Sequence, residues 1–302
     1  MDDFTRALNV TVTIVVTVIA VCVIVAMSGK VSAQARADRF SLRVRLPYGS
    51  EETRESVTRA LRARTIASGY AILAGAALSG ILLFTPLATS PFFIFYTLLT
   101  GLVIGSVVGT TVVSVRERLF HPAPDAPRVA RARTMRVADY LDPARRLLPW
   151  LLAGAALVGV ILIGVFATRT PDRVDGVAGT AAAVFAVVAA AVFVALPLLE
   201  RVILERPQPA SDTLELAWDD ALRVGTIMSL RLSASIAAWF VVSLSIAALW
   251  TNGDALSNAW AMQLPTWGLI ALQFVYPNTG RVLPVQLYPD WLRRPATAAG
   301  AA

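Results

Sequence analysis

Residues 147–168 read LLPWLLAGAALVGVILIGVFAT, a run of 22 positions without a charged side chain. An α-helix rises about 1.5 Å per residue, so this run is long enough to cross a hydrocarbon core of about 30 Å. Only 16% of the 302 residues are charged, whereas soluble domains carry about 25%. The charges crowd into the stretches between such runs, which is typical of a chain whose solvent is partly lipid.

Six further runs of this kind predict an all-α bundle of about seven transmembrane helices in one membrane domain. The predicted spans are residues 8–28, 66–85, 92–115, 147–168, 177–199, 227–250 and 258–276. The first follows an acidic leader and is too long for a signal peptide, so we predict a retained helix. The seventh contains Gln263, Pro265 and Gln273, which a span tolerates when neighbouring helices pack against it. The small-residue tail, 295–302, is predicted to be disordered.

Arginine and lysine are divided unevenly among the connections between these runs. The basic connections are residues 29–65 with nine, 116–146 with eight, 200–223 with three, and the tail after Tyr276 with three. The remaining connections hold only Arg6, Arg169 and Arg173. Basic connections stay in the cytoplasm, so we predict a plasma (inner) membrane protein with its N-terminus outside and its C-terminus inside. This orientation needs an odd number of spans.

The net charge of +7 bears on the partners of the chain. In a membrane protein, basic connections reflect topology and attraction to anionic lipid headgroups. We therefore expect contact with membrane lipids, leave open a protein partner on the cytoplasmic side, and expect no nucleic acid.

After the first span the chain reads as three helical hairpins with outer turns at 86–91, 169–176 and 251–257. Each hairpin follows a cytoplasmic stretch with a helical pattern, a similarity that fits either duplication or chance. Asp142-Pro143 signals the start of the fourth span's helix. Residues 40–46 alternate apolar and polar side chains, which predicts a short strand.

The stretch before the third hairpin has the clearest helix signals. Asp212 can cap it, with Glu215 in capping-box position. Trp218 falls on its apolar face, and Asp219 and Asp220 fall largely on other faces. Two interpretations stay open. The helix lies among the headgroups and docks a partner, or it is a lead-in that extends the sixth span.

Small residues recur every four positions in the second and third spans. They are Ala67, Ala71, Gly75 and Ser79 in the second span, and Gly101, Gly105 and Gly109 in the third. Because lipid tails remove the hydrophobic drive between helices, small residues mark contact faces. We predict that the two ladders lie at helix contacts, most simply with each other. The alternative is a homodimer contact.

Arg231 is the only residue inside a predicted span whose side chain is charged at neutral pH. Ser229, Ser233 and Ser235 make the same end of this span polar. A charge within a span is a candidate functional residue, so these four residues could line a polar vestibule. The competing interpretation is that Arg231, about one turn from the cytoplasmic end, extends its side chain back to the headgroups.

The sequence lacks the common motifs of catalytic and nucleotide-binding sites. The sequence contains no GxxxxGK[ST], HExxH or GxSxG, so we predict no enzyme activity and no cofactor. Cys22 and His121 stand alone, so no metal site is expected.

The segment Ala217-Trp218-Asp219-Asp220-Ala221-Leu222-Arg223 and the use of arginine in place of lysine carry one resemblance. The chain resembles uncharacterised multi-span membrane proteins of high-GC Gram-positive bacteria, a likeness that implies no activity. Three hypotheses follow: an accessory or scaffold protein that binds partners, a permease-like subunit whose ATPase is a separate chain, and an intramembrane enzyme. The third has the least support, because no acid or histidine accompanies Arg231 within the predicted spans.

Overall fold

The computed structural model describes residues 2–84, 91–116, 119–120, 135–208, 210–250 and 255–276. Within these ranges all regular structure is helical. The elements are α1 (Asp2–Ser28), α2 (Lys30–Val44), α3 (Glu51–Leu82), α4 (Pro91–Arg116), α5 (Val137–Tyr140), α6 (Pro143–Arg169), the 3-10 turn η2 (Pro171–Arg173), α7 (Gly176–Glu205), α8 (Thr213–Trp250) and α9 (Ala255–Val275). His121, the tail 295–302 and most of the turns predicted at 86–91 and 251–257 lie outside the described residues.

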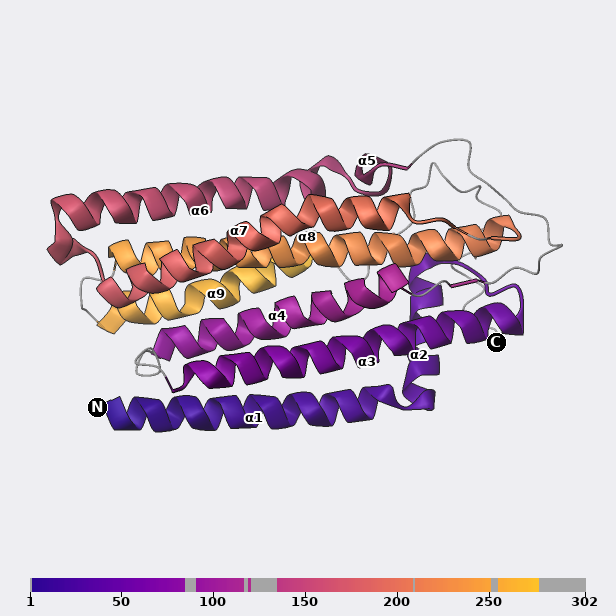
Figure 1. Cartoon of the computed structure of the whole chain (residues 1–302), viewed down its shortest axis with the longest axis horizontal. Helices are drawn as coiled ribbons and strands as arrows, with labels where there is room; N and C mark the ends of the chain where they lie inside the picture. Colours follow the sequence, from indigo (N-terminus) through magenta and orange to yellow (C-terminus); the bar gives the residue numbers. More distant parts are fainter. Residues whose placement is uncertain are drawn as a thin grey trace.

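Within the ranges just given, seven long helices run side by side along the long axis of the molecule, and α2 runs across them (Figure 1). Among the described residues, five helices are long and apolar enough to cross a membrane: α1, α4, α6, α7 and α8. The other two long helices, α3 and α9, lie parallel to these five. The architecture is therefore a helical bundle in which at least five helices have the length and composition of membrane spans.

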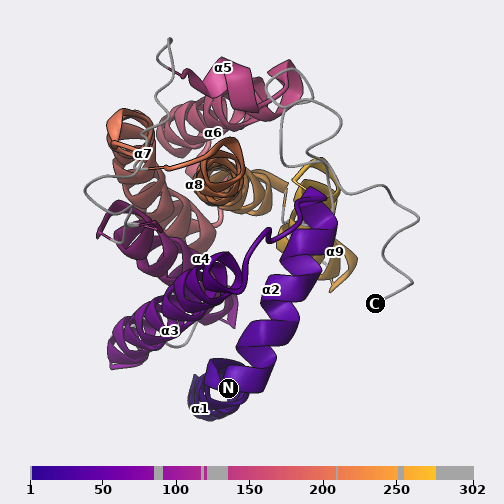
Figure 2. The same ribbon diagram turned by 90° about the vertical axis from the view of Figure 1, so that its right-hand side faces the viewer.

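Helix α8 lies at the centre of the bundle. It packs against α4, α6, α7 and α9, and the end-on view shows it enclosed by them (Figure 2). In its apolar stretch 72% of the residues are buried, compared with 6% in α1 and in α6. Residues that face lipid must be apolar, whereas a helix surrounded by protein can carry polar side chains that bond to its neighbours. This position explains why α8 tolerates Arg231 and its serines.

The helix starts follow local sequence signals. Asp142 accepts a hydrogen bond from Arg145 N at 2.9 Å, and Asp212 accepts one from Glu215 N at 2.7 Å. Both predicted caps are confirmed. A capping box would have the carboxylate of Glu215 accept from the backbone N–H of the cap residue, Asp212. Here it accepts from the backbone N–H of Ser211, one residue earlier, at 2.6 Å.

The strand predicted at 40–46 is wrong, because α2 runs through Val44. A helical spacing explains the difference: Ala33, Ala37, Ser41 and Val44 form one buried face. The alternation within 40–46 is too short to distinguish the two-residue period of a strand from the 3.6-residue period of a helix. The helix ends at Arg45, which takes a left-handed conformation with φ 58°.

The three helical stretches predicted before the hairpins have different outcomes. Residues 50–65 are continuous with α3. Before α6, the described part of the stretch forms only the single turn of α5. The third stretch is the first part of the 38-residue helix α8. The lead-in interpretation is therefore confirmed for this stretch.

The two ladders of small residues face one another across α3 and α4. A methyl group on Gly101 would lie 2.8 Å from the carbonyl oxygen of Gly75. Methyl groups on Gly105 and Gly109 would likewise meet the backbone of Ala71 and Ala67. Ser79 Oγ donates to Thr97 O at 3.1 Å across the same contact. The two helices thus approach backbone to backbone within one chain.

Candidate functional site

Polar side chains gather at one end of the bundle, where α1 finishes and α2 crosses. This end, here called the basic end, is made by α2, the turn 45–50, α5, the linker 206–212 and the first turns of α8. It holds the described parts of the arginine-rich connections. The AWDDALR segment, 217–223, lies in α8 at its centre.

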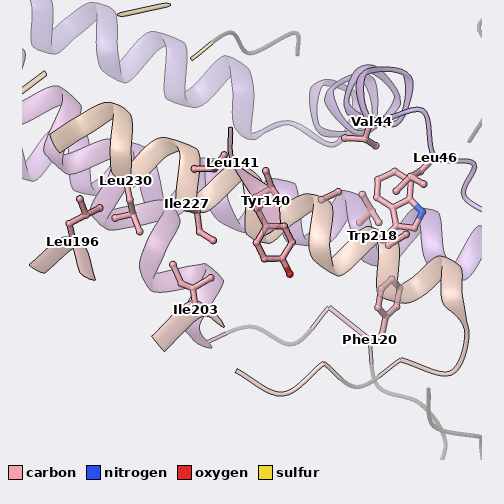
Figure 3. Packing of buried hydrophobic residues seen from close by; sticks show 14 of the residues in the cluster. Val44, Leu46, Phe120, Tyr140, Leu141, Leu196, Ile203, Trp218, Ile227 and Leu230 are labelled. Carbon is pink, nitrogen blue, oxygen red and sulfur yellow. The ribbon is translucent and has the colours of Figure 1, made fainter. Parts of the chain in front are cut away.

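Trp218 lies at the centre of the packing in the basic end. Its side chain is fully buried, and its Nε1 donates to Pro47 O at 3.0 Å. The ring of Tyr48 stacks on the indole at 5.2 Å with an interplanar angle of 4°. Leu46 and Phe120 lie close by, as the close-up shows (Figure 3). The prediction that Trp218 lies at the lipid interface is wrong, because the turn between α2 and α3 covers it.

Asp219 and Asp220 accept hydrogen bonds from side chains of α5 and of the linker 206–212. Gln208 Nε2 donates to Asp219 Oδ2 and to Asp220 Oδ1, each at 2.7 Å. The hydroxyl of Tyr140 in α5 donates to Asp220 Oδ1 at 3.0 Å. Arg223 Nε donates to Asp219 Oδ2 at 2.8 Å. The two carboxylates therefore fasten α5 and the linker 206–212 onto α8.

Arginine side chains tie other backbone segments to the same end. Arg223 Nη2 donates to Arg206 O at 2.7 Å, and Arg206 Nη1 in turn donates to Ser114 O at the end of α4. Arg64 of α3 donates to Leu222 O at 3.1 Å. Ser114 and Arg206 lie at the ends of α4 and α7, where backbone carbonyls lack partners within the helix. The basic end is therefore a folded unit with its own hydrogen-bond network.

Arg231 lies nearer the middle of the bundle and is buried. Its Nε and Nη2 donate to the two carboxylate oxygens of Glu200 in α7, at 2.6 and 2.9 Å. Its Nη1 donates to Arg146 O in α6 at 2.7 Å. The side chain does not extend to the headgroups, so the snorkelling interpretation is wrong. Its polar atoms join three helices.

Glu200 is the partner of Arg231 that sequence reasoning missed. The predicted fifth span stops at residue 199, whereas α7 continues to Glu205 and Glu200 is buried. The expectation that no acid lies within the spans is therefore wrong. The sequence did hold a signal for this pair. Glu200 directly follows the fifth predicted span, Arg231 lies near the start of the sixth, and the two carry opposite charges.

The serines near Arg231 bond mainly within their own helix. Ser229 Oγ donates to Gly225 O, and Ser235 Oγ donates to Arg231 O, each at 2.9 Å. Ser233 is buried. Such bonds to the preceding turn are the usual way for a serine to be satisfied inside a helix. These contacts hold the hydroxyl groups of Ser229 and Ser235 within α8.

The chemistry open to these residues is limited. No group of three or more His, Cys, Asp or Glu in the described ranges is arranged to hold a metal ion. Glu200 and Asp219 both accept from arginine, and Cys22 is exposed on α1. The arrangement acts by joining segments of the chain.

Fold and site together define an all-helical bundle with helices of membrane-spanning length and a folded polar end. Compared with known proteins, the sequence matches no family model, no curated protein and no solved structure.

Proposed function

We propose that this chain is a membrane-embedded scaffold that presents its basic end to a protein partner at the cytoplasmic surface. The observation that carries the proposal is the burial of Trp218 and Asp220, both of which have no exposed surface. Because α2, α5 and Gln208 pack on these two side chains, the described parts of the connections form one ordered surface. An ordered surface loses little conformational entropy when a partner binds it.

The proposal includes seven spans, an outside N-terminus and a cytoplasmic C-terminus in the plasma membrane. Support comes from α3 and α9, which run parallel to the five helices of membrane-spanning length. Residues 65–82 of α3 and all of α9 contain no charged side chain. The basic connections then share one side of the membrane, in agreement with the positive-inside rule. Anionic lipid headgroups are the expected neighbours of these connections.

A permease-like subunit is the second candidate, and the polar groups of α8 count against it. Transport sites use intramembrane polar side chains that face a cavity. Here both carboxylate oxygens of Glu200 are bonded to Arg231, and Ser229 and Ser235 bond to α8 itself. The groups that could serve a substrate are engaged in holding α6, α7 and α8 together.

Co-purification from native membranes tests the function. The wild-type chain should retain a stoichiometric protein partner after mild detergent extraction. Charge reversal at two exposed positions of α2 and α3, Arg39→Glu and Glu52→Arg, should release it while leaving the fold intact. The matched control is Asp172→Arg in the 3-10 turn at the opposite end. Recovery of a nucleotide-binding subunit would favour the permease, and recovery of no partner would overturn the scaffold.

A further inference from the structure

A cleft of about 290 Å³ lies in the corner between α2 and the first turns of α3. Four basic side chains line it, namely Lys30, Arg54, Arg59 and Arg62, together with the carboxylates of Glu51 and Glu55. The cleft adjoins the contacts around Trp218, because Arg54 lies over the ring of Tyr48 at 5.9 Å and that ring stacks on Trp218.

The charges in this cleft are only partly neutralised. Arg54 pairs with Asp38 at 3.4 Å and with Glu51 at 3.7 Å, and these two carboxylates raise the pKa of its guanidinium. Lys30 and Arg59 form no ion pair with any described residue. Arg62 uses its Nε for Ser28 O at 2.9 Å. Lys30, Arg59 and Arg62 therefore carry three positive charges, and Glu55 is the one lining acid not paired with Arg54. This excess of positive charge favours the binding of an anion.

The position of the cleft along the bundle indicates the source of that anion. Lys30 is two residues beyond Ser28, where α1 ends, and Arg62 bonds that same end. Helix α2 then turns across the bundle and runs perpendicular to the spans (Figure 1). A helix that follows a span and lies in the membrane plane is at the depth of the lipid headgroups. The free donors of Lys30 and Arg59 are thus within reach of lipid phosphates.

We propose that the α2–α3 corner is a binding site for the phosphate of an anionic phospholipid such as phosphatidylglycerol. Lys30, Arg59 and the remaining guanidinium nitrogens of Arg62 bind the phosphate oxygens, because charge-assisted hydrogen bonds to phosphate are strong. Glu55 accepts from the glycerol hydroxyls. The site rests on the proposed membrane placement and gives the lipid contact of that proposal a specific location.

Native mass spectrometry of the delipidated full chain tests the site. Phosphatidylglycerol should bind more tightly than phosphatidylcholine with the same acyl chains. The double variant Lys30→Gln/Arg59→Gln should lose about tenfold or more in phosphatidylglycerol affinity, since each charge-assisted bond contributes strongly. Arg39→Gln/Arg43→Gln is the control, because it removes two charges from α2 without touching the cleft lining. The control should bind like the wild type.

The other outcomes overturn the site. Equal affinity in the wild type and the cleft variant, or an equal loss in the control, would reduce the contact to general charge attraction. Displacement of the lipid by inorganic phosphate alone would assign the cleft to a soluble anion. Circular dichroism and the unfolding temperature establish that the cleft variant is folded, and a folded variant that binds normally refutes the proposal. Failure of the co-purification experiment leaves this lipid measurement unaffected.

Discussion

Glu200 on α7 and Arg231 on α8 form a two-pronged ion pair, with both carboxylate oxygens within 2.9 Å of guanidinium nitrogens. The side chains are 9% and 7% exposed, so little water screens them. A third bond, from Arg231 Nη1 to Arg146 O, extends the contact to α6. The central helix is therefore joined to two neighbours through one guanidinium.

Removing one member of this pair is expected to destabilise the bundle. Glu200→Ala leaves Arg231 charged and buried, which costs about 3–5 kcal/mol in comparable buried pairs. The unfolding temperature in detergent should fall sharply. The exposed pair Arg201–Glu205 on the same helix provides the control, and Glu205→Ala should change the unfolding temperature little. A double variant, Glu200→Leu/Arg231→Met, should recover much of the loss. Equal unfolding temperatures for Glu200→Ala and Glu205→Ala would refute a stabilising role.

Close packing between α3 and α4 is expected to depend on Gly105. A side chain at this position meets the backbone of Ala71, so Gly105→Leu should cost about 1–3 kcal/mol or more through overpacking. The readout is the yield of monodisperse protein after extraction. Gly154→Leu on α6 is the matched control, because nothing lies within 4 Å of a Cβ atom added there. Similar yields for the two variants would contradict the packing.

Trp218 should anchor the turn between α2 and α3. Trp218→Ala removes a fully buried side chain, and such changes cost about 3–5 kcal/mol. Limited proteolysis should then cut within 45–50, a turn that should resist cleavage in the wild type. Trp250→Ala, at a side chain that is 69% exposed, should leave this resistance unchanged. An uncut turn in Trp218→Ala would show that other contacts hold it.

Asp220 is expected to control the mobility of α5 and the linker 206–212. Its Oδ1 accepts from both Tyr140 and Gln208, and leaving buried donors without an acceptor costs about 1–3 kcal/mol. Asp220→Ala should speed hydrogen exchange in α5 and in the linker. Asp172→Ala in η2 is the control. Unchanged exchange in both segments would mean that Asp220 does not hold them.

The orientation is testable with single cysteines in a Cys22→Ser background. Glu52→Cys and Glu205→Cys should react with a membrane-impermeant reagent from the same side. Asp172→Cys should react from the opposite side only. All three positions are exposed in the fold. Labelling of residues 52 and 205 from different sides would rule out the proposed topology.

Local signals were sufficient for much of the fold. The long uncharged runs predicted helices that the structure contains, since a chain in lipid must bond every backbone group within its own segment. The starts at Asp142 and Asp212 were predictable because a cap involves residues only three positions apart. The count of seven spans remains a prediction, since five helices meet the criteria for a span among the described residues.

The candidate site could not be predicted in the same way. The partner of Arg231 is 31 residues away, and it lies one residue beyond the predicted end of its span. Trp218 bonds Pro47, 171 residues away, and the stacked ring of Tyr48 comes from the same distant turn. Contacts of this kind separate burial in protein from a place at the membrane surface.

The sequence by itself determined that this chain is helical, that its apolar runs suit lipid, and where several helices begin. These properties depend on composition and on neighbours within one or two turns. Only the tertiary structure decided which helix is central, which acid meets Arg231, and that the basic connections fold around Trp218. Hydrophobicity predicts that a side chain is removed from water, but it does not distinguish between burial in lipid and burial in protein, because the two environments are similarly apolar. The choice between them depends on how distant segments pack.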